Sequence, residues 1–124
     1  MDKAKEFFTK HVDRIISLDT DVMVDEEYHE DAVLVSPFPI YDEPAPYIIR
    51  GNKDLKAFFH RYREWQGNVE IEKVFDYIAA DDVISFSAIV KINTGRWVSG
   101  VSWYLRDGKI AYHFSWGYRL DPPE

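Results

Sequence analysis

The second half of the chain is a series of strand-like segments joined by short turns, and this pattern constrains the fold more than any other feature. The segments are rich in Val, Ile, Phe, Tyr and Trp, which favour strands, and lie near residues 69–79, 83–93, 96–105 and 109–119. The turns between them are short polar pairs typical of hairpins: Asp81-Asp82, Thr94-Gly95 and Asp107-Gly108. We therefore expect an antiparallel meander of four strands.

The first half of the chain predicts three helices. Asp2 can cap a first helix, whose apolar residues share one arc: Ala4, Phe7, Phe8, His11, Val12, Ile15 and Leu18. Asp19 to Asp21 restart the chain into a short second helix that ends near His29. Asn52 is a suitable cap for a third helix, which Gly67 ends, and its buried stripe is Leu55, Phe58, Phe59, Tyr62 and Trp65.

One further strand is expected between the helices. Residues 32–35, Ala-Val-Leu-Val, form a β-branched run that Ser36-Pro37 ends, and the proline-rich stretch 38–47 is expected to be a loop. Three helices followed by a long meander is the α+β pattern of a sheet covered on one side by helices.

Composition limits the classes of partner. The 124 residues form one domain, residues 1–124, and the net charge of −7 without clustered Lys or Arg argues against nucleic acid and anionic membranes. With no cysteine, disulfides and thiolate metal ligands are excluded, and the four histidines have no metal-ligand spacing, so we expect no metal. The charged N-terminal stretch and the lack of cysteine favour a cytoplasmic location. The 4 Trp, 8 Tyr and 8 Phe indicate a large core, a pocket lining or an interface.

Three local strings resemble a known superfamily: Tyr28 to Pro37, Ile49-Arg50-Gly51 with Leu55 and Phe58-Phe59, and Asp107-Gly108-Lys109-Ile110. In order and spacing they are similar to the nuclear-transport-factor-2-like, or cystatin-like, superfamily and within it to the SnoaL-like, polyketide cyclase-like branch. The resemblance implies a cone: a strongly curved, mostly antiparallel sheet closed by helices around an internal pocket. Members include cyclases, isomerases, dehydratases, epoxide hydrolases and non-catalytic modules, so the fold alone does not assign a function.

The same resemblance makes His113 the candidate catalytic residue, because SnoaL-like cyclases carry a cavity-facing histidine at this step of the last strand. Their aspartate two residues later is Ser115 here. Isomerase-like members have a carboxylate where Ser36 stands and a tyrosine where Val12 stands. Epoxide-hydrolase-like members have an arginine and an aspartate where this chain has Ser87 and Ile89. No familiar catalytic set is therefore intact.

Strand pairing leaves open which sheet face lines the pocket. A two-residue turn at Asp107-Gly108 would pair His113 with Ser102, beside Ser87, and would put an aromatic face inside. A glycine bulge at Gly108 would shift the register by one and place Val101 and Trp103 on the His113 face. The resemblance favours His113 inside, which leaves an apolar outer face and predicts a homodimer through it.

Two kinds of function follow from this pocket. The first is acid–base catalysis, such as cyclisation, isomerisation or dehydration, on a small apolar carbonyl compound, with His113 as base or acid. Ser115 or Ser87 would orient it, Tyr28 would add a donor, and His11 and Phe59 would complete the pocket, with no cofactor. The second is a non-catalytic module for a small apolar or aromatic ligand, or a dimeric scaffold. For His11 alone, burial against a carbonyl or carboxylate is the leading expectation.

Overall fold

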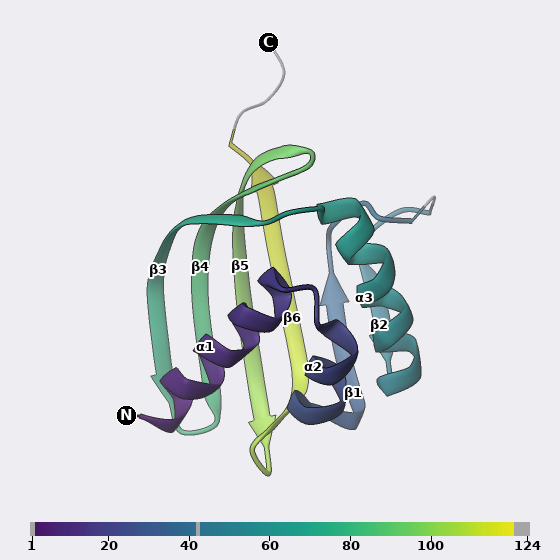
Figure 1. The fold of residues 1–124 in the computed structure, drawn as a ribbon. Helices are drawn as coiled ribbons and strands as arrows, with labels where there is room; N and C mark the ends of the chain where they lie inside the picture. Colours follow the sequence, from purple (N-terminus) through teal and green to yellow (C-terminus); the bar gives the residue numbers. More distant parts are fainter. Residues whose placement is uncertain (1, 42, 121–124) are drawn as a thin grey trace.

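The computed structural model describes residues 2–41 and 43–120 and contains three helices and one six-stranded sheet (Figure 1). The elements are α1 (Lys3–Ile16), α2 (Thr20–Glu27), β1 (Tyr28–Ser36), β2 (Tyr47–Arg50), α3 (Asn52–Gln66), β3 (Glu70–Ala80), β4 (Val83–Ile92), β5 (Gly95–Arg106) and β6 (Lys109–Arg119). The strand order is β2-β1-β6-β5-β4-β3; β1 and β6 are parallel, and every other neighbouring pair is antiparallel.

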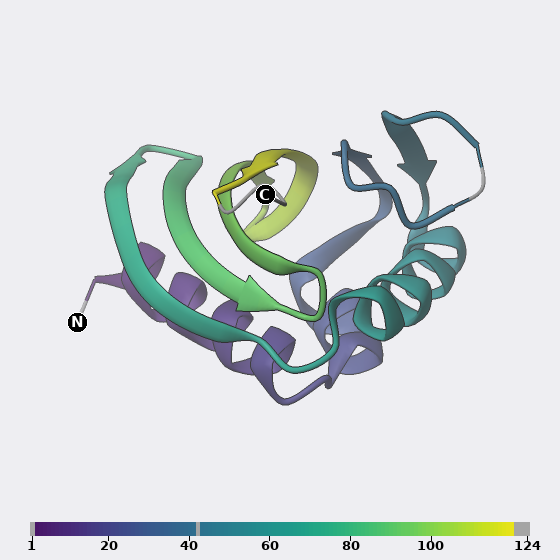
Figure 2. The ribbon, with the colours of Figure 1, turned by 90° about the horizontal axis from the view of Figure 1, so that it is seen from above.

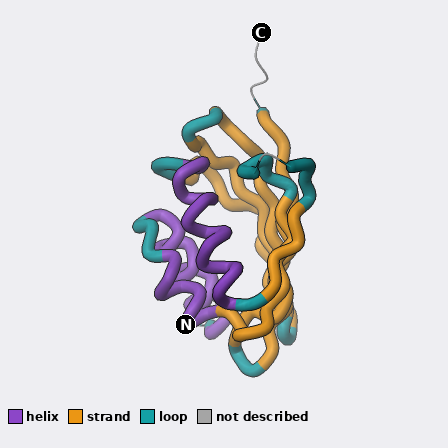
Figure 3. The backbone as a smooth tube through the Cα atoms, turned by 90° about the vertical axis from the view of Figure 1, so that its right-hand side faces the viewer, coloured by secondary structure: helices purple, strands orange, loops and turns teal. Residues whose placement is uncertain are grey.

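All three helices lie on one face of the curved sheet, which Figures 2 and 3 show from two further sides. The large buried side chains, among them Trp103, Tyr28 and Phe58, fill the space between the helices and this inner face. The expected α+β architecture, helices on a strongly curved and mostly antiparallel sheet, is confirmed. Within the described residues no helix has the length and apolar character needed to cross a membrane.

The helix ends follow from local chemistry, with one correction. Asp2 caps α1 as predicted, because its carboxylate accepts a hydrogen bond from the Ala4 amide at 2.9 Å. Asn52 was expected to cap α3, but it is the first helical residue, and the preceding Gly51 occupies the cap position with φ of 84°. That conformation favours glycine and leaves the Asn52 side chain inside the first turn.

Two predicted boundaries in the first half are wrong. The second helix ends at Glu27 rather than near His29, and β1 begins directly after it at Tyr28, which pairs with Ile110 of β6. The proline-rich loop is followed by a short strand, β2, which was missed. β2 is held at the sheet edge by antiparallel pairing, from Ser36 with Tyr47 to Val33 with Arg50. Both strand segments depend on partners distant in sequence, which local patterning does not detect.

The β5–β6 register differs from both sequence alternatives. The turn is the two-residue type, with Arg106 paired to Lys109 and positive φ at Asp107 and Gly108. One step further, Leu105 pairs with Ile110 but Tyr104 pairs with Tyr112, so Ala111 is an extra residue that forms a β-bulge. His113 is therefore opposite Trp103, not Ser102.

Candidate functional site

An apolar cavity of about 120 Å³ lies between the helices and the inner face of the sheet. Its walls come from α1, α3 and the central strands, and most of its lining side chains are aliphatic or aromatic. The polar exceptions among the described lining residues are His11, Ser36, Gln66, Ser99, His113 and Ser115. The cavity thus offers a few polar groups in an apolar surrounding, the usual character of a small-molecule site.

The Ala111 bulge decides which predicted residues reach this cavity. Because successive side chains on a strand point to opposite faces, pairing His113 with Trp103 turns Val101, Trp103, His113 and Ser115 inward together, and all four line the cavity. Trp103 is almost fully buried, and its indole Nε1 has no hydrogen-bond partner among the described residues.

Two predicted pocket residues, Ser87 and Ser102, lie elsewhere. Ser102 is exposed on the outer face, where its hydroxyl is 2.7 Å from that of Ser85. Ser87 is buried, but its neighbours Phe86 and Ala88 are the β4 residues that line the cavity, so Ser87 faces the other way. The expectation that both serines accompany His113 is wrong because it assumed a two-residue turn without a bulge.

A chain of three hydrogen-bonding side chains forms the polar end of the cavity. His113 Nδ1 is 2.7 Å from the Tyr28 hydroxyl, and His113 Nε2 is 2.9 Å from the Ser115 hydroxyl. Tyr28 itself does not line the cavity; it lies behind His113, almost fully buried.

Burial keeps the Tyr28–His113–Ser115 hydrogen-bond chain uncharged. Loss of hydration lowers the pKa of His113 well below its usual value, and the nearby His11 adds a smaller effect in the same direction. Burial, with the Glu27 carboxylate as a lesser cause, raises the pKa of the Tyr28 hydroxyl. Because Tyr28 keeps its proton and has His113 as its only hydrogen-bond partner among the described residues, it donates to Nδ1. Nε2 then carries hydrogen and donates to Ser115, whose own hydrogen is free to bind a ligand.

His11 is the second histidine of the cavity wall and has a carboxylate partner, as its sequence position suggested. Its Nδ1 is 2.9 Å from Glu27 Oε1, and both side chains are buried. The His11 ring lies 4.4 Å from the Trp103 ring and 6.4 Å from the His113 ring, measured between centroids. The two histidines therefore occupy the same region of the cavity.

Of the apolar wall, Phe59, Val101 and Trp103 were predicted from the sequence, and most of the other residues were not. Phe38, Trp65 and Trp97 form a cluster with ring centroids 5.6–5.7 Å apart and line the end formed by α3 and β5. Trp65 already belonged to the predicted buried stripe of the third helix, so its position could have been inferred. Phe38 comes from the proline-rich segment, whose path no sequence period indicates.

Known proteins resemble the chain in structure but not detectably in sequence. No family sequence profile matches it, and no curated protein matches it. An NTF2-like protein of unknown function from Burkholderia xenovorans LB400 aligns with a TM-score of 0.76 at 15% identity, covering 98% of this chain and 88% of that one. A candidate polyketide cyclase from Sinorhizobium meliloti aligns with a TM-score of 0.71 at 16% identity, covering 94% and 100%. TerC, crystallised with polyporic acid, aligns with a TM-score of 0.73 at 16% identity, covering 93% and 91%.

These alignments define the class of structure. The chain has the nuclear-transport-factor-2-like fold, in agreement with the superfamily that its local strings resemble. At such low identity the likeness establishes the fold alone, and the function must be argued from the residues of the cavity.

Proposed function

We propose that the protein is a SnoaL-like small-molecule enzyme that carries out acid–base chemistry on a small, apolar carbonyl compound. The observation that supports this most directly is the uncharged Tyr28–His113–Ser115 chain, which ends in a free hydroxyl hydrogen at a mostly apolar cavity. Likeness to candidate polyketide cyclases is consistent with a carbonyl ligand.

Cavity size sets the scale of the ligand. A cavity of about 120 Å³ is close to the roughly 150 Å³ apolar cavity that accepts benzene. We therefore expect a compound of about one ring, with the ring against the aromatic wall and its oxygen at Ser115. A charged ligand is disfavoured, because no cation among the described lining residues would compensate its burial.

The hydrogen-bond chain suits a carbonyl oxygen that gains negative charge during the reaction. Ser115 donates to the oxygen, His113 donates to Ser115, and Tyr28 donates to His113, so every member is aligned in one direction. Aligned hydrogen bonds polarise one another, and a preorganised donor in a dry site stabilises a developing oxyanion. In the proposed reaction, the Tyr28–His113–Ser115 chain therefore stabilises the negative charge on the carbonyl oxygen.

The experiment uses acetophenone, a one-ring ketone, as probe. Exchange of its methyl hydrogens for deuterium in D₂O, followed by proton NMR, reports removal of a proton next to the carbonyl. We expect the wild-type protein to accelerate exchange, and Ser115→Ala to reduce the acceleration by roughly 100-fold or more, as for loss of an oxyanion donor. Ser102→Ala, the same change on the outer face, is the matched control and keeps the wild-type rate.

A second candidate function is non-catalytic binding, favoured by the absence of a carboxylate at position 115 and by the engagement of both His113 nitrogens. Saturable binding of acetophenone that Ser115→Ala weakens, without any exchange in the wild-type protein, would support this alternative over catalysis.

We also propose that the protein is a homodimer through the outer sheet face. The outward residues of β6 and their neighbour on β5 form a continuous aromatic row that is 45–58% exposed: Tyr104, Tyr112, Phe114, Trp116 and Tyr118. A row of this size is unusual on a monomer, and a second copy related by twofold symmetry offers a matching apolar surface.

A further inference from the structure

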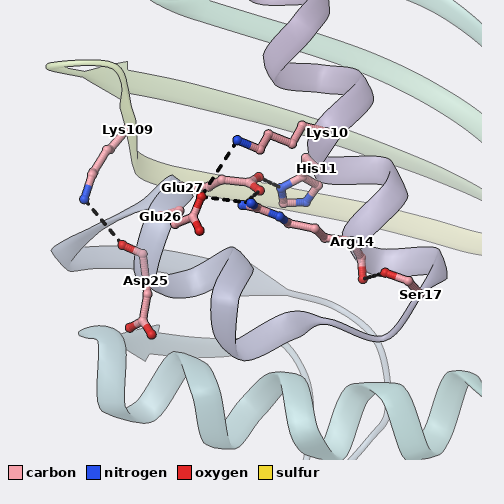
Figure 4. A network of polar contacts seen from close by, with 8 residues as sticks. All are labelled: Lys10, His11, Arg14, Ser17, Asp25, Glu26, Glu27 and Lys109. Carbon is pink, nitrogen blue, oxygen red and sulfur yellow. Dashed lines mark hydrogen bonds and ion pairs between the residues drawn. The ribbon is translucent and has the colours of Figure 1, made fainter.

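We propose that His11, held by Glu27 and Arg14, is the proton acceptor of the cavity, and that His113 serves only the hydrogen-bond chain. This inference rests on the proposed function and deepens it, since it assigns the base that the Tyr28–His113–Ser115 chain lacks. Figure 4 shows the group, in which Glu27 of α2 lies between the His11 and Arg14 side chains of α1.

The contacts of Glu27 fix which nitrogen of His11 carries hydrogen. Glu27 Oε2 accepts a hydrogen bond from Arg14 at 2.6 Å, and Oε1 lies 2.9 Å from His11 Nδ1. A carboxylate whose second oxygen accepts from a guanidinium is an acceptor of hydrogen bonds, which assigns Nδ1 as the donor to Oε1. The lone pair of the neutral ring is therefore on Nε2.

Nε2 is the free side of the ring. It forms no hydrogen bond with any residue that the structure describes, although the His11 side chain is buried and lines the cavity. His113 is also buried and lines the cavity, but both of its ring nitrogens are hydrogen-bonded to hydroxyl groups. Of the two histidines, only His11 presents an available lone pair.

The charged neighbours support proton uptake by His11 specifically. A carboxylate at Nδ1 orients an imidazole and stabilises the positive charge that it acquires with a second proton. Glu27 is in turn held by Arg14, which also contacts Glu26 at 2.9 Å, so the carboxylate is fixed in position. His113 has two neutral partners, and burial lowers its pKa, so it is poorly suited to take a proton.

The two groups lie close enough to act on one small molecule. The His11 and His113 rings are 6.4 Å apart between centroids, and Ser115 adjoins His113. For a ketone bound with its oxygen at Ser115, Nε2 takes a proton from the carbon next to the carbonyl. The C–H electron pair forms a C=C bond, and the carbonyl π pair moves to the oxygen, where the Ser115 hydroxyl stabilises it. Return of the proton to the same carbon completes exchange, and return to another carbon completes an isomerisation.

The first test needs no substrate. Long-range ¹⁵N–¹H NMR of the histidine rings at neutral pH reports which nitrogen carries hydrogen. We expect opposite tautomers, with hydrogen on Nδ1 of His11 and on Nε2 of His113. A His11 ring with hydrogen on Nε2, or one that stays doubly protonated wherever the protein is folded, has no lone pair at Nε2 and would overturn the assignment.

The second test uses acetophenone exchange in the full chain. His11→Asn keeps a side-chain N–H for Glu27 but removes the base. We expect it to lower the exchange rate by at least about 100-fold. Glu27→Gln is the second variant, should His11→Asn fail to fold; it removes the charge that holds the ring and lowers the rate while acetophenone still binds. His60→Asn is the matched control, because His60 is a partly exposed histidine of α3 that pairs with Asp21 of α2 and does not line the cavity.

The outcomes separate the two proposals. Loss of exchange in His11→Asn with retained binding, together with a normal His60→Asn, supports His11 as the base. A wild-type rate in His11→Asn, with loss in Ser115→Ala, overturns the assignment of His11 but leaves the proposed function standing. A wild-type protein that binds acetophenone without exchange overturns both the base and the catalytic proposal.

Discussion

Buried neutral His113 should make the stability of the protein depend on pH in a defined direction. The folded chain holds His113 with a lowered pKa, because burial removes its hydration, whereas in the unfolded chain its pKa returns to about 6.5. Below that pH the unfolded state binds a proton that the folded state does not, so the free energy of unfolding falls as pH falls. Above that pH neither state binds this proton, and His113 no longer makes the free energy of unfolding depend on pH.

The magnitude follows from the size of this proton-binding difference. At pH 5.5, one unit below the unfolded value, the loss approaches about 1.4 kcal/mol, and it grows by at most about 1.4 kcal/mol per further unit. His113 forms no ion pair with a carboxylate among the described residues that would offset this penalty; its contacts are the hydroxyls of Tyr28 and Ser115.

The assay is urea unfolding followed by tryptophan fluorescence at pH 7.5, 6.5 and 5.5. His113→Gln removes the titrating ring, so the difference in unfolding free energy between wild type and variant should narrow by about 1.4 kcal/mol between pH 7.5 and 5.5. Leu55→Ala is the control: it is destabilised at a fully buried position of α3 that does not line the cavity, it retains His113, and it should keep the pH dependence of the wild type. Parallel curves for wild type and His113→Gln would refute the argument.

Three further predictions concern the outer face and the hydrogen-bond chain. Phe114→Lys places a charge in the outer aromatic row, and sedimentation should show the change from dimer to monomer; a wild-type monomer would contradict the dimer. Gly100→Ala would bring a methyl group within 2.0–2.3 Å of the Trp116 indole, so the indole must move off the sheet; we expect a loss of about 1 kcal/mol on unfolding and a changed Trp116 fluorescence. Tyr28→Phe removes the donor to His113 Nδ1 and should cost about 1 kcal/mol, with NMR showing mixed tautomers of His113; a single unchanged tautomer would argue against the chain.

Much of the architecture could be predicted because its signals are local. The hairpin at Asp107-Gly108, the apolar arc of α1 and the stop at Gly67 depend on a few neighbouring residues. These predictions are confirmed, except that Leu18, placed on the arc, lies beyond the end of α1 at Ile16 with φ of 63°. The burial of His11 against a carbonyl or carboxylate was also expected from its place on that arc, and the structure shows the carboxylate. Its partner Glu27 could not be named, because the contact depends on how α2 packs beside α1.

The candidate site was predicted only in part, because it depends on register. One alternative placed Val101 and Trp103 on the same sheet face as His113, and the other placed Ser87 and Ser102 there. The alternation of side chains along the strands is compatible with either register, so it could not decide between them. A bulge at Ala111 costs the strand one pairing but lets Trp103 and the helices pack against each other. This preference arises in the assembled core and not in the hairpin itself.

The number of residues that follow the Ala111 bulge determines which side chains of β6 face the cavity. Inward positions on β6 are even-numbered before it, at Ile110, and odd-numbered after it, at His113 and Ser115. A deletion of Ala111 would preserve that inward set and straighten the hairpin, whereas one residue inserted between Tyr112 and His113 would carry both polar groups to the outside. During divergence of such chains, a single codon gained in this strand would remove His113 and Ser115 from the cavity while every other lining side chain stayed the same.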